Sequence, residues 1–264
     1  MDLKNNRQSF LGGNLDKVLS QSLVGIIGLG GGGSQIVQQL AHIGFKRYLL
    51  CDFDTIEETN LNRLVGATIS DIESKSRKVD IAVRLIRSLH PDAEIQSIPK
   101  RFQEEAAALM KCNIIFGCLD GLGNRDQLER LTRSAKIPYI DIGMDVNDKI
   151  ATEPPRMSGQ VIASLPGCPC MRCYGYLNEE ELSKEYAAYG DAGVRPQVIW
   201  PNGVLSSTAI GIALNLLTHW TDRSNKQILY YEYDGNSGTL KPHLFYEREL
   251  HRNTSCPHYP GFHS

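Results

Sequence analysis

A glycine cluster follows the first strongly apolar run of the chain. The run 24–27 leads into Gly28–Gly33, where five of six residues are glycine, and apolar residues then recur at helical spacing over 35–44. Glycine lets backbone approach a phosphate closely and accepts positive φ, while free N–H groups at the start of the next helix face the anion. The pattern indicates a phosphate site, although a glycine turn that binds nothing is the alternative. Its candidate binding residues are Gly28, Gly30, Gly31 and Gly33.

Carboxylates follow two other predicted strands at their ends. Asp52 comes directly after the strand 46–51, and Asp120 comes after the strand 113–119. In a dinucleotide-binding fold, an acidic residue at the end of the second strand accepts hydrogen bonds from the ribose hydroxyls. Asp52 is in that position. Because the carboxyl ends of parallel strands lie at one edge of the sheet, we expect Asp52, Asp120 and the glycine turn to line one crevice.

Cysteines near the middle and the end of the chain have the spacing of a metal site. Cys170 and Cys173 form a Cys-x-x-Cys pair, and Cys256 is followed closely by His258. Two such pairs can complete a tetrahedral zinc site that pins the tail to the body. A redox pair is the alternative, but it normally opens a helix after the first strand of a thioredoxin-like unit. The other candidate ligands are Cys168, His251 and His263, whereas Cys51, Cys112 and Cys118 lie in apolar runs typical of core thiols.

Alternating strand and helix patterns must position these residues. Over about 120 residues the order is that of a doubly wound, mostly parallel, Rossmann-like α/β sheet, whose ligands bind beyond the carboxyl ends of the strands. The predicted strands are 24–27, 46–51, 94–99, 113–119 and 138–143, and the predicted helices are 35–44, 74–89, 103–111 and 124–136.

The pattern changes after residue 145. Residues 149–165 favour two antiparallel strands with a turn or bulge at 157–160, and residues 202–220 favour a helix whose small residues allow close packing. Further strands are expected at 227–233 and 239–245, and an acidic helix at 178–191. We therefore divide one continuous domain into a mobile arm and short helix (1–22), a nucleotide-binding half (23–145), and a substrate-binding half with a crossover segment and the zinc site (146–264).

The composition limits the classes of binding partner and the cellular locations that we expect. The formal net charge of the 264 residues is −2, which gives no electrostatic reason to expect a nucleic-acid or anionic-membrane partner. The first ten residues are polar and contain no signal-peptide core, and no apolar stretch is long enough to span a bilayer. We expect a cytoplasmic location.

Five short motifs together resemble the ThiF/MoeB/HesA family, whose adenylating core is shared with ubiquitin-activating enzymes. The resemblance covers residues 7–258 and rests on the glycine turn, on the string from Asp52 to Arg63, on Lys78-Val79, on Asp120-x-x-x-x-Arg125 and on the first cysteine pair. It implies an adenylyltransferase that binds ATP and Mg²⁺. Its substrate would be a ubiquitin-like protein, whose C-terminal glycine carboxylate it converts to an acyl-adenylate with release of pyrophosphate.

The resemblance also implies a role for each motif residue. Asp52 would hold the ribose, with Asp54 of the same string beside the nucleotide. Asn60, Arg63 and Lys78 would contact the phosphates, Arg63 and Lys78 neutralising charge in the transition state. Asp120 would bind Mg²⁺, and Arg7 would reach from a mobile arm into the neighbouring subunit's site in a homodimer. The alternative to Lys78 is Lys75, because the spacing from Arg63 is slightly longer than usual.

Two departures from the family pattern bear on chemistry. The last zinc pair is usually Cys-x-x-Cys, whereas here His258 follows Cys256, so the fourth ligand stays open. Members that form a thioester keep a cysteine in the crossover segment, and none lies between Cys173 and Cys256. We therefore expect the reaction to stop at the acyl-adenylate or to pass the acyl group directly to an acceptor protein, with Cys168 as the spare loop thiol.

Three other functions remain open at this stage. Within the family, the substrate could be a short peptide or another small carboxylate. An NAD-dependent oxidoreductase would share the glycine turn and Asp52, but would have no use for Asn60, Arg63, Lys78 and Asp120 together. A non-catalytic scaffold subunit is disfavoured because this set of residues is complete. The helix 202–220 and the Arg7 arm favour a homodimer.

Overall fold

The computed structural model describes residues 3–147, 154–187, 196–221, 228–244 and 256–259. Within these residues, one eight-stranded sheet has the order β3-β2-β1-β4-β5-β6-β7-β8. Strands β1 to β5 pair in parallel, and β5 to β8 pair antiparallel. The strands are β1 Leu23–Ile27, β2 Arg47–Cys51, β3 Glu94–Ile98, β4 Ile114–Gly117, β5 Tyr139–Asn147, β6 Arg156–Ser164, β7 Tyr230–Asp234 and β8 Thr239–Pro242.

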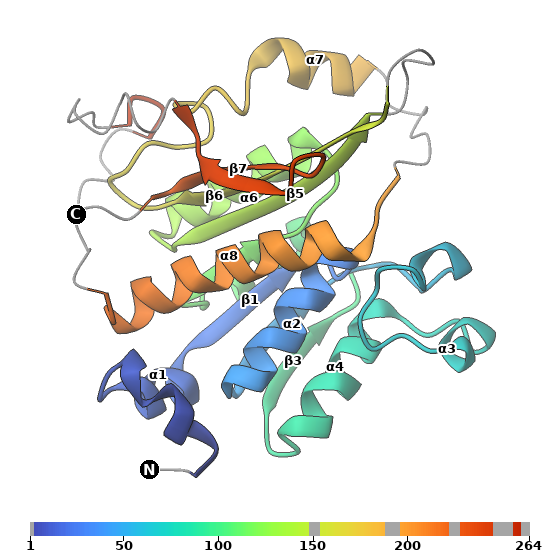
Figure 1. Cartoon of the computed structure of the whole chain (residues 1–264), viewed down its shortest axis with the longest axis vertical. Helices are drawn as coiled ribbons and strands as arrows, with labels where there is room; N and C mark the ends of the chain where they lie inside the picture. The colour runs from blue at the N-terminus through green and yellow to red at the C-terminus, as the bar shows by residue number, and fades with distance from the viewer. Residues whose placement is uncertain (1–2, 148–153, 188–195, 222–227, 245–255, 260–264) are drawn as a thin grey trace.

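Helices cover both faces of the sheet. Figure 1 shows α2, α4 and α8 on the near face, with α6 behind the sheet. None of the helices in the described part of the chain is both long and apolar enough to cross a membrane. The helical elements are η1 Leu3–Leu11, α1 Leu15–Gln21, α2 Gly31–Ile43, η2 Glu58–Asn60, α3 Ile69–Glu73, α4 Lys78–Leu89, η3 Phe102–Glu105, α5 Ala106–Leu109, α6 Leu122–Ser134, α7 Glu179–Ala187 and α8 Ile199–Thr218.

The strand order creates a crevice at the centre of the sheet. The chain passes from β1 through α2 to β2 on one side, whereas β4 pairs with the other side of β1. Both strands are buried on both faces, which explains why they read as continuous apolar runs. The connections that leave β1 and β4 therefore diverge at the carboxyl ends, where α/β sheets bind ligands. The predicted doubly wound sheet that continues into antiparallel strands is confirmed.

Several helices begin at residues other than those predicted, among them α2, α4, α6 and α8. The helix after the glycine turn begins at Gly31, so most of the cluster belongs to the helix. The helix predicted over 74–89 begins only at Lys78, because the residues just before it form hydrogen bonds with the segment after β2. The N–H of Ile56 donates to the Ser76 carbonyl, and Lys75 has a φ of 52°. These long-range contacts override the local helical pattern.

The turn predicted at 157–160 is wrong. Strand β6 runs without interruption, and nine of its residues pair in register with β5, from Arg156 opposite Asn147 to Ser164 opposite Tyr139. The glycine that suggested a turn has a packing role. A Cβ on Gly159 would lie 2.7 Å from Cδ1 of Leu205 in α8. The helix thus packs directly on the strand at this point.

The N-terminal residues form a helix where an arm was expected. Residues Leu3–Leu11 form the 3₁₀ helix η1, which is held by its own side chains. Leu11 is buried, Gln8 Nε2 donates to the Ile43 carbonyl at 3.2 Å, and the rings of Phe10 and Trp220 meet edge to face. In this monomer, η1 packs against its own chain.

Candidate active site

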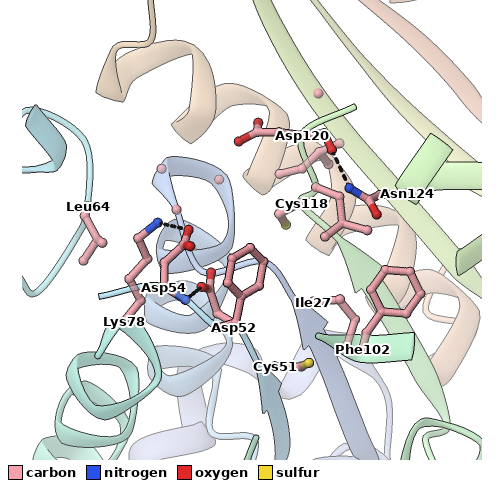
Figure 2. A pocket seen from close by; sticks show the side chains of 18 of the residues that line it. Ile27, Cys51, Asp52, Asp54, Leu64, Lys78, Phe102, Cys118, Asp120 and Asn124 are labelled. Atoms are coloured by element: carbon pink, nitrogen blue, oxygen red, sulfur yellow. Dashed lines mark hydrogen bonds and ion pairs between the residues drawn. The ribbon is translucent and has the colours of Figure 1, made fainter. Parts of the chain in front are cut away.

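A cleft opens at the carboxyl ends of β1, β2 and β4 (Figure 2). It brings together residues from four of the five motifs, which were predicted to act as one site. Glycine backbone forms one wall, and both acidic and basic side chains face the space. The predicted residues that line the cleft are Gly28, Gly30, Gly31, Asp52, Asp54, Asn60, Arg63, Lys78 and Asp120.

Glycine is required for a different structural reason at each of three positions in the turn. Gly28 has a φ of +87°, and a Cβ there would lie 2.4 Å from the Cys118 carbonyl oxygen. A Cβ on Gly30 would meet nothing within 4 Å, so this residue leaves room in the cleft. Gly33 does not line the cleft, and its missing Cβ would lie 1.9 Å from the Gly28 carbonyl oxygen. The close packing of α2 on the turn therefore depends on Gly33, while the first N–H groups of α2, which have no partner within the helix, would be available to an anion.

Asp52 is buried at the end of β2 and is held by backbone. Its Oδ2 accepts a hydrogen bond from the Leu29 N–H at 2.6 Å, and its Oδ1 accepts one from the Asp54 N–H at 2.8 Å. Burial raises the pKa of Asp52 above its ordinary value, while the Lys78 ammonium and the two N–H groups act in the opposite direction. The carboxylate is therefore fixed beside the glycine turn, at the place where a ribose would be bound.

Lys78 is held in the cleft by an ion pair. Its Nζ lies 2.7 Å from Oδ2 of Asp54, and its side chain is only 12% exposed (Figure 2). Its backbone N–H also donates to the Asp54 carbonyl at 3.1 Å. The alternative lysine, Lys75, does not line the cleft. The geometry therefore favours Lys78 as the lysine that would contact phosphate.

Arg63 lies against the first turn of α2. Its Nη1 donates to the Thr59 carbonyl at 2.6 Å and to Asn62 Oδ1 at 3.0 Å. Its Cδ would be 3.3 Å from a Cβ on Gly31, so the side chain crosses the glycine backbone. Asn60 is buried nearby, and its Oδ1 accepts a hydrogen bond from the Glu57 N–H at 3.2 Å. Among the described residues Arg63 has no carboxylate partner, which leaves its charge available for an anion.

Asp120 and Arg125 lie on the other side of the cleft. The Asp120 side chain is exposed, and among the described residues its Oδ1 has only a long contact of 3.5 Å with Gln197 Nε2. Such an exposed carboxylate suits Mg²⁺, which prefers oxygen ligands. Arg125 is buried and donates to the carboxylate of Asp141 and to the Leu119 carbonyl. The Arg125 guanidinium is thus engaged in hydrogen bonds within the protein, whereas Asp120 faces the cleft.

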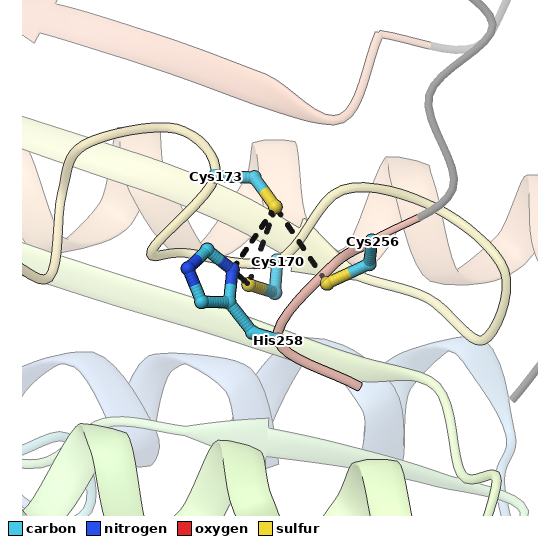
Figure 3. A group of neighbouring side chains, drawn as sticks. All are labelled: Cys170, Cys173, Cys256 and His258. Atoms are coloured by element: carbon cyan, nitrogen blue, oxygen red, sulfur yellow. Dashed lines mark hydrogen bonds between the residues drawn. The ribbon is translucent and has the colours of Figure 1, made fainter. Parts of the chain in front are cut away.

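A second cluster joins the two ends of the C-terminal half (Figure 3). The ligand atoms of Cys170, Cys173, Cys256 and His258 all lie within 4.8 Å of one another. The Sγ atoms of Cys173 and Cys256 are 3.6 Å apart, and His258 Nδ1 is 3.4 Å from Sγ of both Cys170 and Cys173. A tetrahedral Zn²⁺ with Zn–S bonds of about 2.3 Å would place its sulfurs about 3.8 Å apart. The four side chains therefore fit a zinc ion.

Buried charges hold the first cysteine pair. The Arg133 side chain is fully buried and donates to the carbonyls of Cys168 and Pro169 at 2.9 and 2.8 Å. Glu129 Oε1 accepts a hydrogen bond from the Met171 N–H at 2.9 Å. Both come from α6, so the helix that begins next to the cleft also supports this group of candidate zinc ligands. Cys168 is not part of the cluster, and His251 and His263 lie outside the described residues.

Comparison with known proteins places the chain in a family. A model described as the ThiF family matches residues 3–258. The chain belongs to the ThiF family. This confirms the resemblance carried by the motifs, and this ThiF chain has homologues named as adenylyltransferases.

Several relatives cover nearly the whole ThiF chain. The molybdopterin-synthase adenylyltransferase of Salmonella typhimurium is 29% identical over 261 residues, which is 96% of this chain and 94% of that protein. The SAMP-activating enzyme E1 of Haloferax volcanii is 24% identical over 217 residues, covering 81% of this chain and 74% of that protein. A crystal structure of E. coli MccB with succinimide has the same fold, with a TM-score of 0.73 at 18% identity over 92% of this chain and 72% of that chain.

Other cleft residues of the ThiF chain were not predicted. Asn202 of α8 is buried, and its Nδ2 would lie 2.6 Å from a Cβ on Gly31. The only local signal was a polar residue within an apolar helix. Arg101 lies over the Phe53 ring, 4.4 Å from its centroid, and both residues line the cleft. No sequence motif connects these two residues, because they meet only after β2 and β3 have paired.

Arg7 is the one predicted catalytic residue of the ThiF chain that lies outside its own cleft. It is an exposed residue of η1. It does not line the cleft of this monomer. Its predicted role in the site of a second subunit therefore stays a prediction.

Proposed function

We propose that this ThiF-family chain is an ATP-dependent adenylyltransferase. Its acyl substrate is the C-terminal glycine carboxylate of a ubiquitin-like protein. The observation that carries the proposal is the convergence of the glycine turn, Asp52, Arg63, Lys78 and Asp120 on one cleft. An oxidoreductase would not need both cations and a second carboxylate around the phosphate-binding turn.

The residues present suit the attack of a carboxylate on a phosphate. A carboxylate oxygen of the substrate forms a bond to the α-phosphorus of ATP, and the bond from that phosphorus to the oxygen bridging to the β-phosphate breaks. Pyrophosphate leaves with the bonding electrons. Both reactants are anions, so cations at the site lower the barrier. Arg63 and Lys78 supply positive charge, the N–H groups of α2 bind phosphate oxygens, and Asp120 would hold Mg²⁺, which supplies further charge neutralisation.

Two parts of the proposal concern partners. We propose a homodimer in which Arg7 of one subunit enters the site of the other, supported by the exposed apolar side chains Ile199 (42% exposed), Trp200 (58%) and Val204 (37%) on α8. We also propose that the acyl-adenylate is the final product on this chain, or that its acyl group passes directly to an acceptor protein. The support is the absence of any cysteine between Cys173 and Cys256.

A short peptide is the second candidate substrate. The microcin C7 biosynthetic enzyme MccB has been solved in complex with N-formylated MccA, and it shares the fold of this chain with a TM-score of 0.73. The fold is therefore compatible with a partner that is not a ubiquitin-like protein. Other small carboxylates belong to the same alternative.

ATP–pyrophosphate exchange with Mg²⁺ tests the proposal. The substrates are small proteins that end in glycine, short peptides, and a control without substrate. Exchange that requires a glycine-terminal protein supports the proposal, and exchange with a peptide alone favours the second candidate. Asp120→Ala should abolish exchange, whereas Asp92→Ala should not, because Asp92 forms a surface ion pair with Lys46 outside the cleft. Absence of exchange with every substrate, together with tight NAD binding, would overturn the proposal.

Two lysine variants distinguish a direct contact with phosphate from a general effect of positive charge. Lys78→Ala should reduce the exchange rate about 100-fold, because one transition-state cation is lost. Lys75→Ala removes the same charge three residues away and should leave the rate nearly unchanged. Equal losses in the two variants would contradict the assignment of Lys78.

A further inference from the structure

The turn that carries Asp120 is held by a side chain from a distant helix. The N–H of Leu122 donates to Oε1 of Glu185 at 2.9 Å, and the N–H of Gly123 donates to Oε2 at 2.7 Å. Glu185 belongs to α7, about 60 residues later in the chain. Its carboxylate thus binds two of the N–H groups that α6 leaves unpaired at its start.

The local structure is built for this contact. Gly121, which precedes α6, has a φ of +85°, and a Cβ there would lie 2.9 Å from Glu185 Oε1. A side chain at this position would therefore crowd the carboxylate. α7 is also held elsewhere, because Leu182 is buried and Arg172, which pairs with Asp126 of α6 at 3.0 Å, also pairs with Glu179 of α7. Charge-assisted bonds at the positive end of a thirteen-residue helix are favourable.

A second residue from the same part of the chain contacts Asp120 itself. Gln197, which precedes α8, places Nε2 3.5 Å from Asp120 Oδ1. Its carbonyl accepts a hydrogen bond from Asn62 Nδ2 at 3.0 Å, so Gln197 also contacts the segment that carries Arg63. Residues before and after the connection from α7 to α8 therefore both contact the Asp120 turn.

We propose that Glu185 is a positioning residue for Asp120. By holding the N–H groups of Leu122 and Gly123, it fixes the Gly121 turn and with it the carboxylate that would bind Mg²⁺. The inference rests on the proposed function, in which Asp120 holds Mg²⁺ beside ATP. The proposal couples the position of α7 to the affinity of the site for Mg²⁺. The motifs alone do not contain this coupling.

The first test measures ATP affinity by calorimetry at a series of Mg²⁺ concentrations. In Glu185→Ala, the Mg²⁺ concentration that gives half of the gain in ATP affinity should rise about tenfold, since two charge-assisted bonds are lost. Glu185→Gln keeps one acceptor oxygen and should show a smaller rise. Glu181→Ala is the matched control, because Glu181 lies on the same helix and, within the part of the chain that the structure describes, its side chain pairs only with Lys184 at the surface. A curve for Glu185→Ala that matches the wild type, or a loss of affinity that is independent of Mg²⁺, overturns the proposal.

A second test needs no nucleotide. Hydrogen exchange of a peptide spanning residues 118–125 should be faster in Glu185→Ala than in the wild type, and unchanged in Glu181→Ala. If the wild type binds no ATP, the proposed function fails, while this measurement still decides whether Glu185 holds the turn. Equal exchange in Glu185→Ala and the wild type shows that it does not.

Discussion

Removal of zinc should destabilise the fold, because the four candidate ligands join residues 170–173 to residues 256–258. His258→Ala removes one of four ligands whose atoms lie within 4.8 Å of one another. Its matched control is Cys168→Ser, which changes a thiol next to the cluster but outside it. We expect the control to retain about one zinc per chain and His258→Ala to lose it to a chelator that the wild type resists.

The size of the effect follows from the length of chain that the cluster closes. Cys173 and Cys256 are 83 residues apart, and a cross-link over a loop of this length removes about 4.5 kcal/mol of conformational freedom from the unfolded chain. A loss of that size should lower the midpoint of thermal unfolding by roughly 10 °C or more. Zinc that binds to the cysteines and histidines of the unfolded chain would reduce this loss of stability.

The assay combines metal analysis with thermal unfolding under reducing conditions. Zinc per chain is measured by mass spectrometry, and the unfolding midpoint is measured with and without chelator. The reasoning is refuted if reduced wild-type protein contains no zinc and its midpoint does not respond to zinc or chelator. It is also refuted if Cys168→Ser loses zinc as readily as His258→Ala, because the cluster would then have a different set of ligands.

Two further predictions concern the glycine turn and a capping carboxylate. Gly28→Ala would place a Cβ 2.4 Å from the Cys118 carbonyl oxygen, so chemical denaturation should show a loss of about 2 kcal/mol or more, and ATP binding should weaken. Gly66→Ala is the control, because φ is similarly positive at +84° but a Cβ would have no neighbour closer than 3.7 Å. For Asp71, the hydrogen bond from Arg84 holds the pKa of the carboxyl well below its usual range, so its contribution to stability is complete above about pH 4 and is lost as the pH falls towards the folded-state pKa. The difference in unfolding free energy between the wild type and Asp71→Asn should therefore shrink below pH 4, and a difference that grows there would contradict this sign.

The parallel half of the fold could be predicted because its signals are local. Buried strands such as β1 are short apolar runs that end in glycine or aspartate, and helices such as α4 have one apolar face. The errors came from contacts between distant segments. Gly159 resembled a turn residue because nothing local shows that Leu205 packs on it, and the start of α4 was placed too early because the pairing of residue 55 with residue 77 is tertiary.

The residues of the candidate site also fall into two groups, those that the sequence predicts and those that only the structure reveals. Asp52, Arg63 and Lys78 belong to strings whose residue types and spacing carry the chemistry, so they could be named before the structure was known. Asn202 and Glu185 could not, because Asn202 reaches the cleft and Glu185 reaches the Asp120 turn from other helices, and neither has a pattern around it. His258 was correctly grouped with the cysteines from its spacing alone, although only the structure shows that its Nδ1 faces them.

Strand β5 has a consequence for how the chain can be divided. It pairs in parallel with β4 through residues 139–141 and antiparallel with β6 along its whole length, so the boundary predicted after residue 145 falls inside it. A fragment that ends there would expose a bare strand edge prone to aggregation, and the complementary fragment would lack the template for β6. Split-protein complementation at this boundary should therefore fail. The intact chain should melt as one cooperative unit, because neither half can complete its sheet alone.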